Sequence, residues 1–285
     1  MNVFTDYSTF SGWHDAYCDF LNNLEASSSN DSSPTSSSND KDMDDMDTPS
    51  LSCLVSFSPT LEPGVEVEAC PDSGCTMSVI SEDFSKKIGV QILQTPIILI
   101  VSTGARIKPV GQAIVFVKVE RVSVKRLKVL VVKSDADDLI ISYRDLITLR
   151  ALAPNFPNQV TDKEAPLLPH PNGNISEAPF LTCRVRAGSK IDITVEAVPD
   201  SGCTGSSRIS KHFANKCGIR VYPTSFESMH SKVSGQAWIS IKIKDKLKIN
   251  RLVMVCNITD DMLLCWRDLI DLGVLAHDFP RPAPE

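Results

Sequence analysis

The residues best placed to do chemistry are two aspartates in a repeated hexapeptide. Pro-Asp-Ser-Gly-Cys-Thr occurs at 71–76 and again at 199–204, each time directly after a strand-like stretch. An Asp at the end of a buried strand lies in a loop, where Ser can hydrogen-bond neighbouring backbone and Gly lets another segment approach closely. A single Asp-Ser-Gly is usually only a turn. Its repetition with the same flanks favours a pair of functional carboxylates, Asp72 and Asp200.

The hexapeptide belongs to a longer internal repeat, which we expect to define two domains. The matching segments come in the same order, and the second copy is four residues shorter between the hexapeptide and Gly-Gln-Ala. The predicted copies span 51–157 and 181–280, joined by a Pro-rich linker at 158–180 and followed by a short tail at 281–285. The matched pairs are 65–76 with 193–204, 111–113 with 235–237, and 144–152 with 267–275.

Each copy is predicted to be mostly β-strand. Val65, Val67 and Ala69 alternate with glutamates, as a strand with one buried face requires, and the same period continues at 113–119 and 238–244. One short helix per copy is expected at the C-terminal Arg-Asp-Leu segment, directly after an apolar strand. The predicted fold class is therefore all-β, with two tandem domains.

Composition limits the partners that we expect. The net charge of −6 divides unevenly, because residues 1–50 hold ten acidic residues and one lysine, −9 in all, which leaves +3 for the rest. With no basic block in the body, we expect no nucleic-acid partner. No apolar run reaches about 18 residues and the first residues lack a signal-peptide pattern, so we expect a cytoplasmic protein without membrane contact.

The N-terminal region is expected to stay outside the folded domains. Residues 26–50 are nearly all Ser, Asp, Asn, Thr and Pro, a composition that cannot bury enough apolar area to order itself. Residues 1–25 carry aromatic residues spaced by three or four, which indicates a short amphipathic or docking segment. We therefore predict a disordered acidic tail at 1–50 that contains one short aromatic segment.

The cysteines and histidines do not indicate a cofactor site. The nine cysteines are odd in number and lack the spacing of zinc ligands, which argues against a disulfide framework or a metal centre. Cys75 and Cys203 recur after the glycines, but no His recurs with them, so a Cys–His nucleophile is not expected. No metal and no cofactor is predicted.

The order of these segments resembles the retropepsins, the aspartic proteases of retroviruses and LTR retrotransposons. The shared features are a strand, Asp-Ser-Gly, a hairpin region, and an apolar strand that ends in Arg-Asp-Leu and a helix, and they cover nearly all of 51–280. In that family each subunit of a dimer gives one such loop. The resemblance implies two subunits fused into a single-chain pseudo-dimer, with a homodimer as the alternative. Cys after Asp-Ser-Gly is similar to retrotransposon polyprotein segments.

The resemblance also implies the chemistry of the site and a polypeptide substrate. Two carboxylates about 3 Å apart cannot both ionise, so they share a proton and can activate water for peptide hydrolysis. The residues that the resemblance implies are Asp72 and Asp200 as the catalytic pair, Ser73 and Ser201 as hydroxyls that lock the two loops, and Gly74 and Gly202 as the points where the loops meet.

A flap over the substrate is implied at 101–113 of the first copy. Gly104 and Gly111 are predicted to bracket the hairpin tip, and the flap residues are Thr103, Gly104, Ala105, Arg106 and Ile107. The second copy offers only the shorter 229–237. We therefore expect one full flap and one stub.

The sequence departs from the family pattern just before each predicted helix. Tyr143 and Trp266 stand where retropepsins usually have Gly. Arg144, Asp145, Arg267 and Asp268 follow them and are predicted to be structural. Each arginine is either in an ion pair or an exposed charge at the start of the helix. The predicted activity is an aspartic endopeptidase, and the alternative is a non-catalytic binding or assembly module with the same fold.

Overall fold

The structure is a computed structural model, in which both predicted copies belong to the same unit of the chain. The residues that it describes are 49–120, 122–133, 137–157, 179–187, 192–203, 205–224, 233–243 and 247–281. The predicted tail at 1–50, the linker at 158–180 and the tail at 281–285 lie almost wholly outside these ranges.

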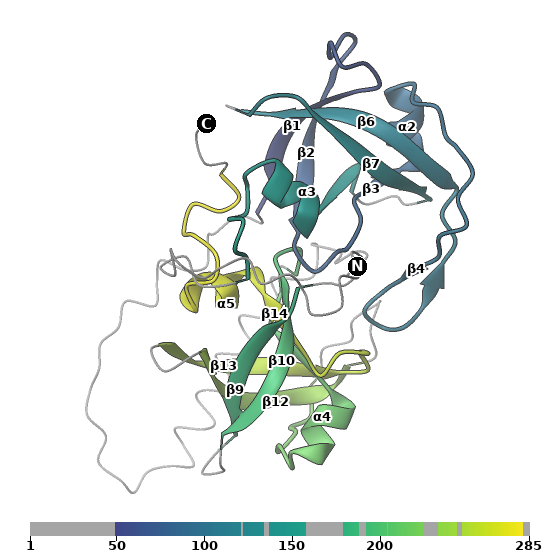
Figure 1. The fold of residues 1–285 in the computed structure, drawn as a ribbon. Coiled ribbons are helices and arrows are strands. Elements are labelled where there is room, and N and C mark those ends of the chain that lie inside the picture. Colours follow the sequence, from purple (N-terminus) through teal and green to yellow (C-terminus); the bar gives the residue numbers. More distant parts are fainter. Residues whose placement is uncertain are drawn as a thin grey trace, which may run out of the picture. The chain divides into compact units, whose positions relative to one another are not determined.

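The first copy forms a closed six-stranded barrel (Figure 1). The strand order around the barrel is β1-β2-β8-β3-β7-β6, and a separate two-stranded hairpin is made of β4 and β5. The elements are β1 (Leu51–Ser56), β2 (Val65–Asp72), β3 (Val79–Ser81), α2 (Glu82–Lys87), β4 (Leu99–Ile100), β5 (Arg106–Ile107), β6 (Gly111–Val119), β7 (Lys125–Val132), β8 (Leu139–Ser142) and α3 (Tyr143–Thr148).

The second copy forms a barrel of the same connectivity (Figure 1). Its order, β10-β14-β11-β13-β12-β9, repeats that of the first barrel when each strand is replaced by its counterpart. The elements are β9 (Leu181–Arg186), β10 (Ile193–Asp200), β11 (Arg208–Ser210), α4 (Lys211–Lys216), β12 (Val233–Ile243), β13 (Leu247–Cys256), β14 (Met262–Cys265) and α5 (Trp266–Asp271). The prediction of an all-β fold in two tandem copies is confirmed.

The alternation of the strands places every second side chain in a barrel interior. Val115 and Val117 of β6 are fully buried, as are Ile239 and Ile241 of β12 to within a few per cent. The helices α3 and α5 follow β8 and β14 where the Arg-Asp-Leu segments predicted them. Burial of these alternating β-branched residues is the main force that holds each barrel together.

Each barrel also has a second helix that the sequence analysis did not predict. Helices α2 and α4 have six residues each, which is too short to show a 3.6-residue apolar period. The feature that indicates these helices is an N-cap serine. Ser81 accepts the Phe84 N–H at 3.0 Å, and Ser210 accepts the Phe213 N–H at 2.9 Å.

The strand registers show where along the chain the two copies differ in length. The isolated bridges Leu93–Gln112 and Tyr222–Gln236 are equivalent, and they enclose 18 and 13 residues. Copy two has therefore lost five residues here. It has gained one earlier, because Ser210 follows Asp200 by ten positions whereas Ser81 follows Asp72 by nine. The net difference is the four residues seen in the sequence.

The described helices include none that is long and apolar enough to cross a membrane. Within the same described ranges, no three side chains of His, Cys, Asp or Glu gather as ligands for a metal ion.

Candidate active site

Each Asp-Ser-Gly loop is fixed at the end of a central barrel strand. Strand β2 runs parallel to β8 and ends with Asp72 opposite Ser142, and β10 ends in the same way with Asp200 opposite Cys265. The Cys75 N–H closes a turn onto the Asp72 carbonyl at 3.2 Å, and Cys203 does the same to Asp200 at 3.2 Å. The two aspartates therefore leave equivalent strands in equivalent turns.

The first residue of helix α3 and of helix α5 donates a backbone hydrogen bond to the Asp-Ser-Gly loop of its own copy. The backbone N–H of Tyr143 donates to the Cys75 carbonyl at 3.2 Å, and that of Trp266 donates to the Cys203 carbonyl at 3.3 Å. Because these bonds use the backbone, they do not need the glycine that the family pattern has at this position. The large side chains are accommodated, with Trp266 buried and Tyr143 half-buried.

Four hydrogen bonds join the two loops through their serines. The Ser73 hydroxyl donates to the Pro199 carbonyl at 2.7 Å and accepts the Ser201 N–H at 2.9 Å. The Ser201 hydroxyl donates to the Pro71 carbonyl at 2.6 Å and accepts the Ser73 N–H at 2.9 Å. Both serines are fully buried. Each hydroxyl thus satisfies two backbone groups of the other copy, which fixes the distance between the loops.

The glycines of the two loops lie against the aspartates of the opposite copy. A Cβ on Gly74 would come within 3.0 Å of the Asp200 Cγ, and a Cβ on Gly202 would come within 2.9 Å of the Asp72 Cγ. No larger residue fits at either position unless a carboxyl group moves. This packing brings the two carboxyl groups together.

Burial and proximity act on the carboxyl pair. Asp72 is 4% exposed and Asp200 is 3% exposed. Burial raises the pKa of Asp200 well above its ordinary value, and the charge of Asp72 and a hydrogen bond between the two carboxyl groups raise this pKa further. Asp72 also accepts the Gly74 N–H at 2.9 Å. The pair can therefore hold one proton between the two groups.

The aspartates of helices α3 and α5 anchor the chain beside each loop. Asp145 accepts from the Ser78 and Ser142 hydroxyls at 2.5 and 3.3 Å. Asp268 accepts from the Ser207 hydroxyl and from the Arg251 guanidinium. In turn, Ser78 and Ser207 accept the N–H of the last residue of β8 and of β14, both at 3.0 Å.

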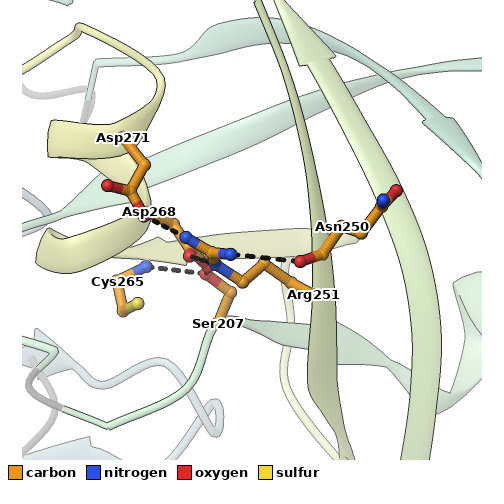
Figure 2. A network of polar contacts seen from close by, with 6 residues as sticks. All are labelled: Ser207, Asn250, Arg251, Cys265, Asp268 and Asp271. Atoms are coloured by element: carbon orange, nitrogen blue, oxygen red, sulfur yellow. Dashed lines mark hydrogen bonds and ion pairs between the residues drawn. The ribbon is translucent and has the colours of Figure 1, made fainter. Parts of the chain in front are cut away.

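Arg251 gives copy two an ion-pair network that includes both carboxylates of α5 (Figure 2). Its guanidinium contacts Asp268 and Asp271 and also donates to the Asn250 carbonyl at 3.1 Å. In the parallel registers Ile80 pairs with Val131 and Ile209 with Val255, so Arg251 occupies the position of Leu127 in copy one.

The two helix arginines lie against the aromatic residues that precede them. Arg144 lies over the Tyr143 ring, 5.4 Å from its centroid, and donates to the Tyr143 hydroxyl at 2.8 Å. Arg267 lies over the Trp266 ring at 5.6 Å. This cation–π contact is a role that the sequence analysis did not consider beside an ion pair or an exposed charge.

The predicted flap of copy one is a hairpin whose turn contacts copy two. Strands β4 and β5 pair, and the turn between them is closed by the Gly104 N–H to the Val101 carbonyl at 2.7 Å. Gly104 has a φ of 81°, so the turn itself favours a glycine. The Ser102 carbonyl accepts the Thr259 N–H at 2.9 Å and the Thr259 hydroxyl at 3.1 Å.

The structure differs from the flap prediction at Gly111 and covers only part of the stub predicted in copy two. The prediction that Gly111 brackets the hairpin tip is wrong, because Gly111 begins β6 and is needed for close contact with the Leu93 carbonyl, 2.4 Å from where a Cβ would lie. Of the stub predicted at 229–237, residues 229–232 lie outside the described ranges and 233–237 form the start of β12.

Thr103, Ala105, Arg106 and Ile107 belong to the hairpin, with Ala105 and Arg106 exposed and Ile107 half-buried in β5. The loop cysteines are unsuited to nucleophilic attack, because burial raises the pKa of Cys75 and of Cys203 to about 12.

Several supporting residues were not identified from the sequence. Ser78 and Ser207 recur in both copies close after the hexapeptide, and this recurrence was an available signal. Arg251, Asp271 and Thr259 have no counterpart of the same type in copy one, so the repeat could not indicate them.

Comparison with known proteins gives one family match. Residues 59–144 match the family model described as aspartyl protease. Among solved structures, the chain is similar to the retroviral protease-like domain of Ddi1 from Leishmania major, with 18% identity over 36% of this chain and 76% of that chain and a TM-score of 0.26. A search of curated proteins finds no match. The family match lies within copy one, and the barrel of copy two repeats the strand connectivity of copy one.

Proposed function

We propose that the protein is an aspartic endopeptidase in which Asp72 and Asp200 form one catalytic pair within a single chain. The observation that carries the proposal is the crossed set of serine hydrogen bonds, since these hold two buried carboxyl groups within hydrogen-bonding reach of each other. The match of 59–144 to aspartyl proteases supports a protease-type function. The substrate class is polypeptide.

The chemistry needs one proton on the pair. The unprotonated carboxylate takes a proton from a water molecule held between the two groups, and this water attacks the peptide carbonyl carbon. The protonated carboxyl group donates to the carbonyl oxygen as the tetrahedral intermediate forms. Collapse of the intermediate returns a proton to the amine that leaves. Because burial raises the pKa of Asp200, this carboxyl is suited to hold the proton in the resting enzyme.

The proposed working unit is the monomer. Both loops come from one chain, and each serine bonds the loop of the other copy, so a second chain is not required to complete the pair. The recurrence of Cys after Asp-Ser-Gly supports an origin in a retrotransposon polyprotein.

A fluorogenic peptide library tests the proposal with the parent protein, Asp72→Asn and Asp200→Asn. Each variant should lose at least about 1,000-fold in kcat/KM, and the double variant should be scarcely worse than either single variant, because the two groups act as one unit. Asp83→Asn is the matched control, since Asp83 is exposed on α2. A statine peptide, which mimics the tetrahedral intermediate, should inhibit the parent.

Two results would contradict the proposal in different ways. If the parent shows no statine-sensitive cleavage at any pH, the protein is not a peptidase and the binding-module alternative applies. If Asp200→Asn keeps full activity, copy two supplies no catalytic carboxylate, and the enzyme must be a homodimer built from copy one.

A further inference from the structure

The two barrels present different walls beside their aspartates. Strands β3 and β11 are equivalent, since each pairs parallel with one neighbour and antiparallel with the strand that leads to the C-terminal helix. In β3, Val79 lies opposite Leu130 and Ile140. In β11 the equivalent position is Arg208. One wall therefore carries an aliphatic side chain where the other carries a cation.

The wall of copy one is apolar and lies under the flap. Val79 belongs to a small buried cluster that is separate from the barrel interior, whereas the next residue, Ile80, faces that interior. The cluster includes Leu99 of flap strand β4, and Ile107 of β5 packs against it. Side chains at this position thus point out of the barrel, toward the space that the flap covers.

The wall of copy two has the same layout around Arg208. Met254 and Leu263 lie opposite it, and Cys256 occupies the place of Val132. These three neighbours are buried, and none of them is an acidic or basic residue. The guanidinium is therefore the charged group that distinguishes this wall from that of copy one.

Arg208 is half-buried and is close enough to the catalytic pair to influence it. Its charge lowers the pKa of Asp200, in opposition to the larger effect of burial. Cys203 and Cys265 also lie within electrostatic reach, but burial raises the pKa of Cys203 to about 12 and that of Cys265 well above its ordinary value, so both stay neutral. The charge of Asp200 also acts on Arg208 and raises its pKa, but among the described residues no carboxylate lies within ion-pairing distance of the guanidinium.

A partly desolvated guanidinium with no carboxylate at hydrogen-bonding distance is unfavourable. It becomes favourable when a ligand supplies the carboxylate, because Arg binds carboxylates through two parallel hydrogen bonds. At the corresponding place in copy one, the Val79 side chain can offer only apolar contact.

We propose that Arg208 determines specificity by binding an acidic side chain of the substrate on the copy-two side of the cleft, while the Val79 wall takes an apolar side chain on the copy-one side. This inference rests on the proposed peptidase function. It makes the preferred cleavage site asymmetric, with Glu or Asp on one side of the scissile bond and an aliphatic residue on the other.

Paired peptides that differ only by Glu and Gln at each position around the scissile bond test the inference. The parent should prefer Glu by about 10- to 100-fold at one position, the usual strength of a hydrogen-bonded charge pair. Arg208→Met should abolish this preference, so that the Glu and Gln peptides are cleaved with equal kcat/KM at each pH. Arg208→Glu should reverse the preference toward a Lys peptide.

The control is Arg184→Met, which removes the same charge from the exposed face of β9, opposite β11 in the barrel order. It should leave the Glu preference intact. A second measurement compares the affinity of Asp72→Asn for uncleaved Glu and Gln peptides by fluorescence polarisation, so the selectivity is measured without turnover.

The outcomes separate this inference from the proposed function. If the parent cleaves peptides without a Glu preference at any position, the inference is wrong and the peptidase stands. If Arg208→Met changes the rates for Glu and Gln peptides equally and shifts only the pH profile, Arg208 tunes Asp200 and does not select substrate. If nothing is cleaved, the peptidase proposal fails, and equal affinities for the two peptides would then overturn the inference as well.

Discussion

The two barrels have equivalent Asp-Ser-Gly loops, but the aspartate of the C-terminal helix has different neighbours in each barrel. Asp145 of copy one accepts two serine hydroxyls, and Leu127 lies where copy two has Arg251. Asp268 of copy two meets the guanidinium of Arg251, which also pairs with Asp271. Burial raises the pKa of Asp145, so its charge is the less well compensated of the two.

The difference shows which contacts two fused copies must keep in common. The Ser73 and Ser201 bonds are reciprocal, so a change in one copy leaves groups of the other without partners. The contacts that support each C-terminal helix lie within one barrel, and so do the residues of the wall beside each aspartate, so both can diverge. A symmetric homodimer has no such freedom, because each substitution appears twice.

The largest effect is expected from the reciprocal contact. Ser73→Ala would leave the Pro199 carbonyl and the Ser201 N–H buried without partners. The free energy of unfolding should therefore fall by about 2–4 kcal/mol, and kcat/KM should fall at least tenfold. Ser201→Ala should give equal losses. Chemical denaturation and peptide cleavage measure both.

The matched control is Ser85→Ala, because Ser85 is fully buried but its hydroxyl donates to Glu82 within its own helix. It should leave activity nearly unchanged. Ser73→Thr keeps a hydroxyl and should restore most of the loss. Clearly unequal effects of the two alanine variants would show that the loops are not equivalent.

The next effect should appear in copy two alone. Arg251→Leu introduces the residue that copy one has, but it leaves buried Asp268 and half-buried Asp271 without their cation. A loss of about 2–3 kcal/mol is expected. Adding Asp271→Thr, which matches Thr148 of copy one, should recover part of that loss. Urea unfolding of the three proteins measures it, and full additivity of the two substitutions would contradict the network.

Much of this architecture was predictable because it is repeated. Asp72 and Asp200, the strand periods and the Arg-Asp-Leu helices are each written twice, and the repetition distinguished them from ordinary turns and charges. The helices at Ser81 and Ser210 were missed because six residues show no period. Arg251 and Arg208 were missed for a different reason. Each is a departure from the repeat, and its meaning depends on strand registers that only a structure supplies.

A smaller effect is expected where the flap of copy one contacts copy two. Thr259→Val removes the hydroxyl bond to the Ser102 carbonyl and keeps the backbone bond. A lid held by one bond fewer should close less often, so KM should rise about two- to fivefold with little change in kcat. Steady-state kinetics measure the change. Thr148→Val, which removes a local helix bond on α3, should leave KM unchanged, and an equal rise in both variants would exclude a role of the flap contact.

The smallest effect, and the one that best separates the barrels, is the pH dependence of Asp145→Asn. The raised pKa of Asp145 means that the folded state binds more protons than the unfolded state between the unfolded value, about 3.9, and the folded one. The stability of the parent from this group is therefore fully present below that window and is lost as pH rises through it. Asn cannot ionise, and its side-chain oxygen can still accept from Ser78 or Ser142. The free energy of unfolding of Asp145→Asn, measured relative to the parent, should thus rise with pH by at most about 1 kcal/mol. Urea unfolding of both proteins from pH 3.5 to 7 gives this difference directly.

Asp268→Asn is the comparison, because it deprives Arg251 of a carboxylate and should be destabilised at pH 7. If Asp145→Asn instead loses stability relative to the parent as pH rises, ionised Asp145 is stabilised in the folded protein, and the contrast between the two barrels is wrong.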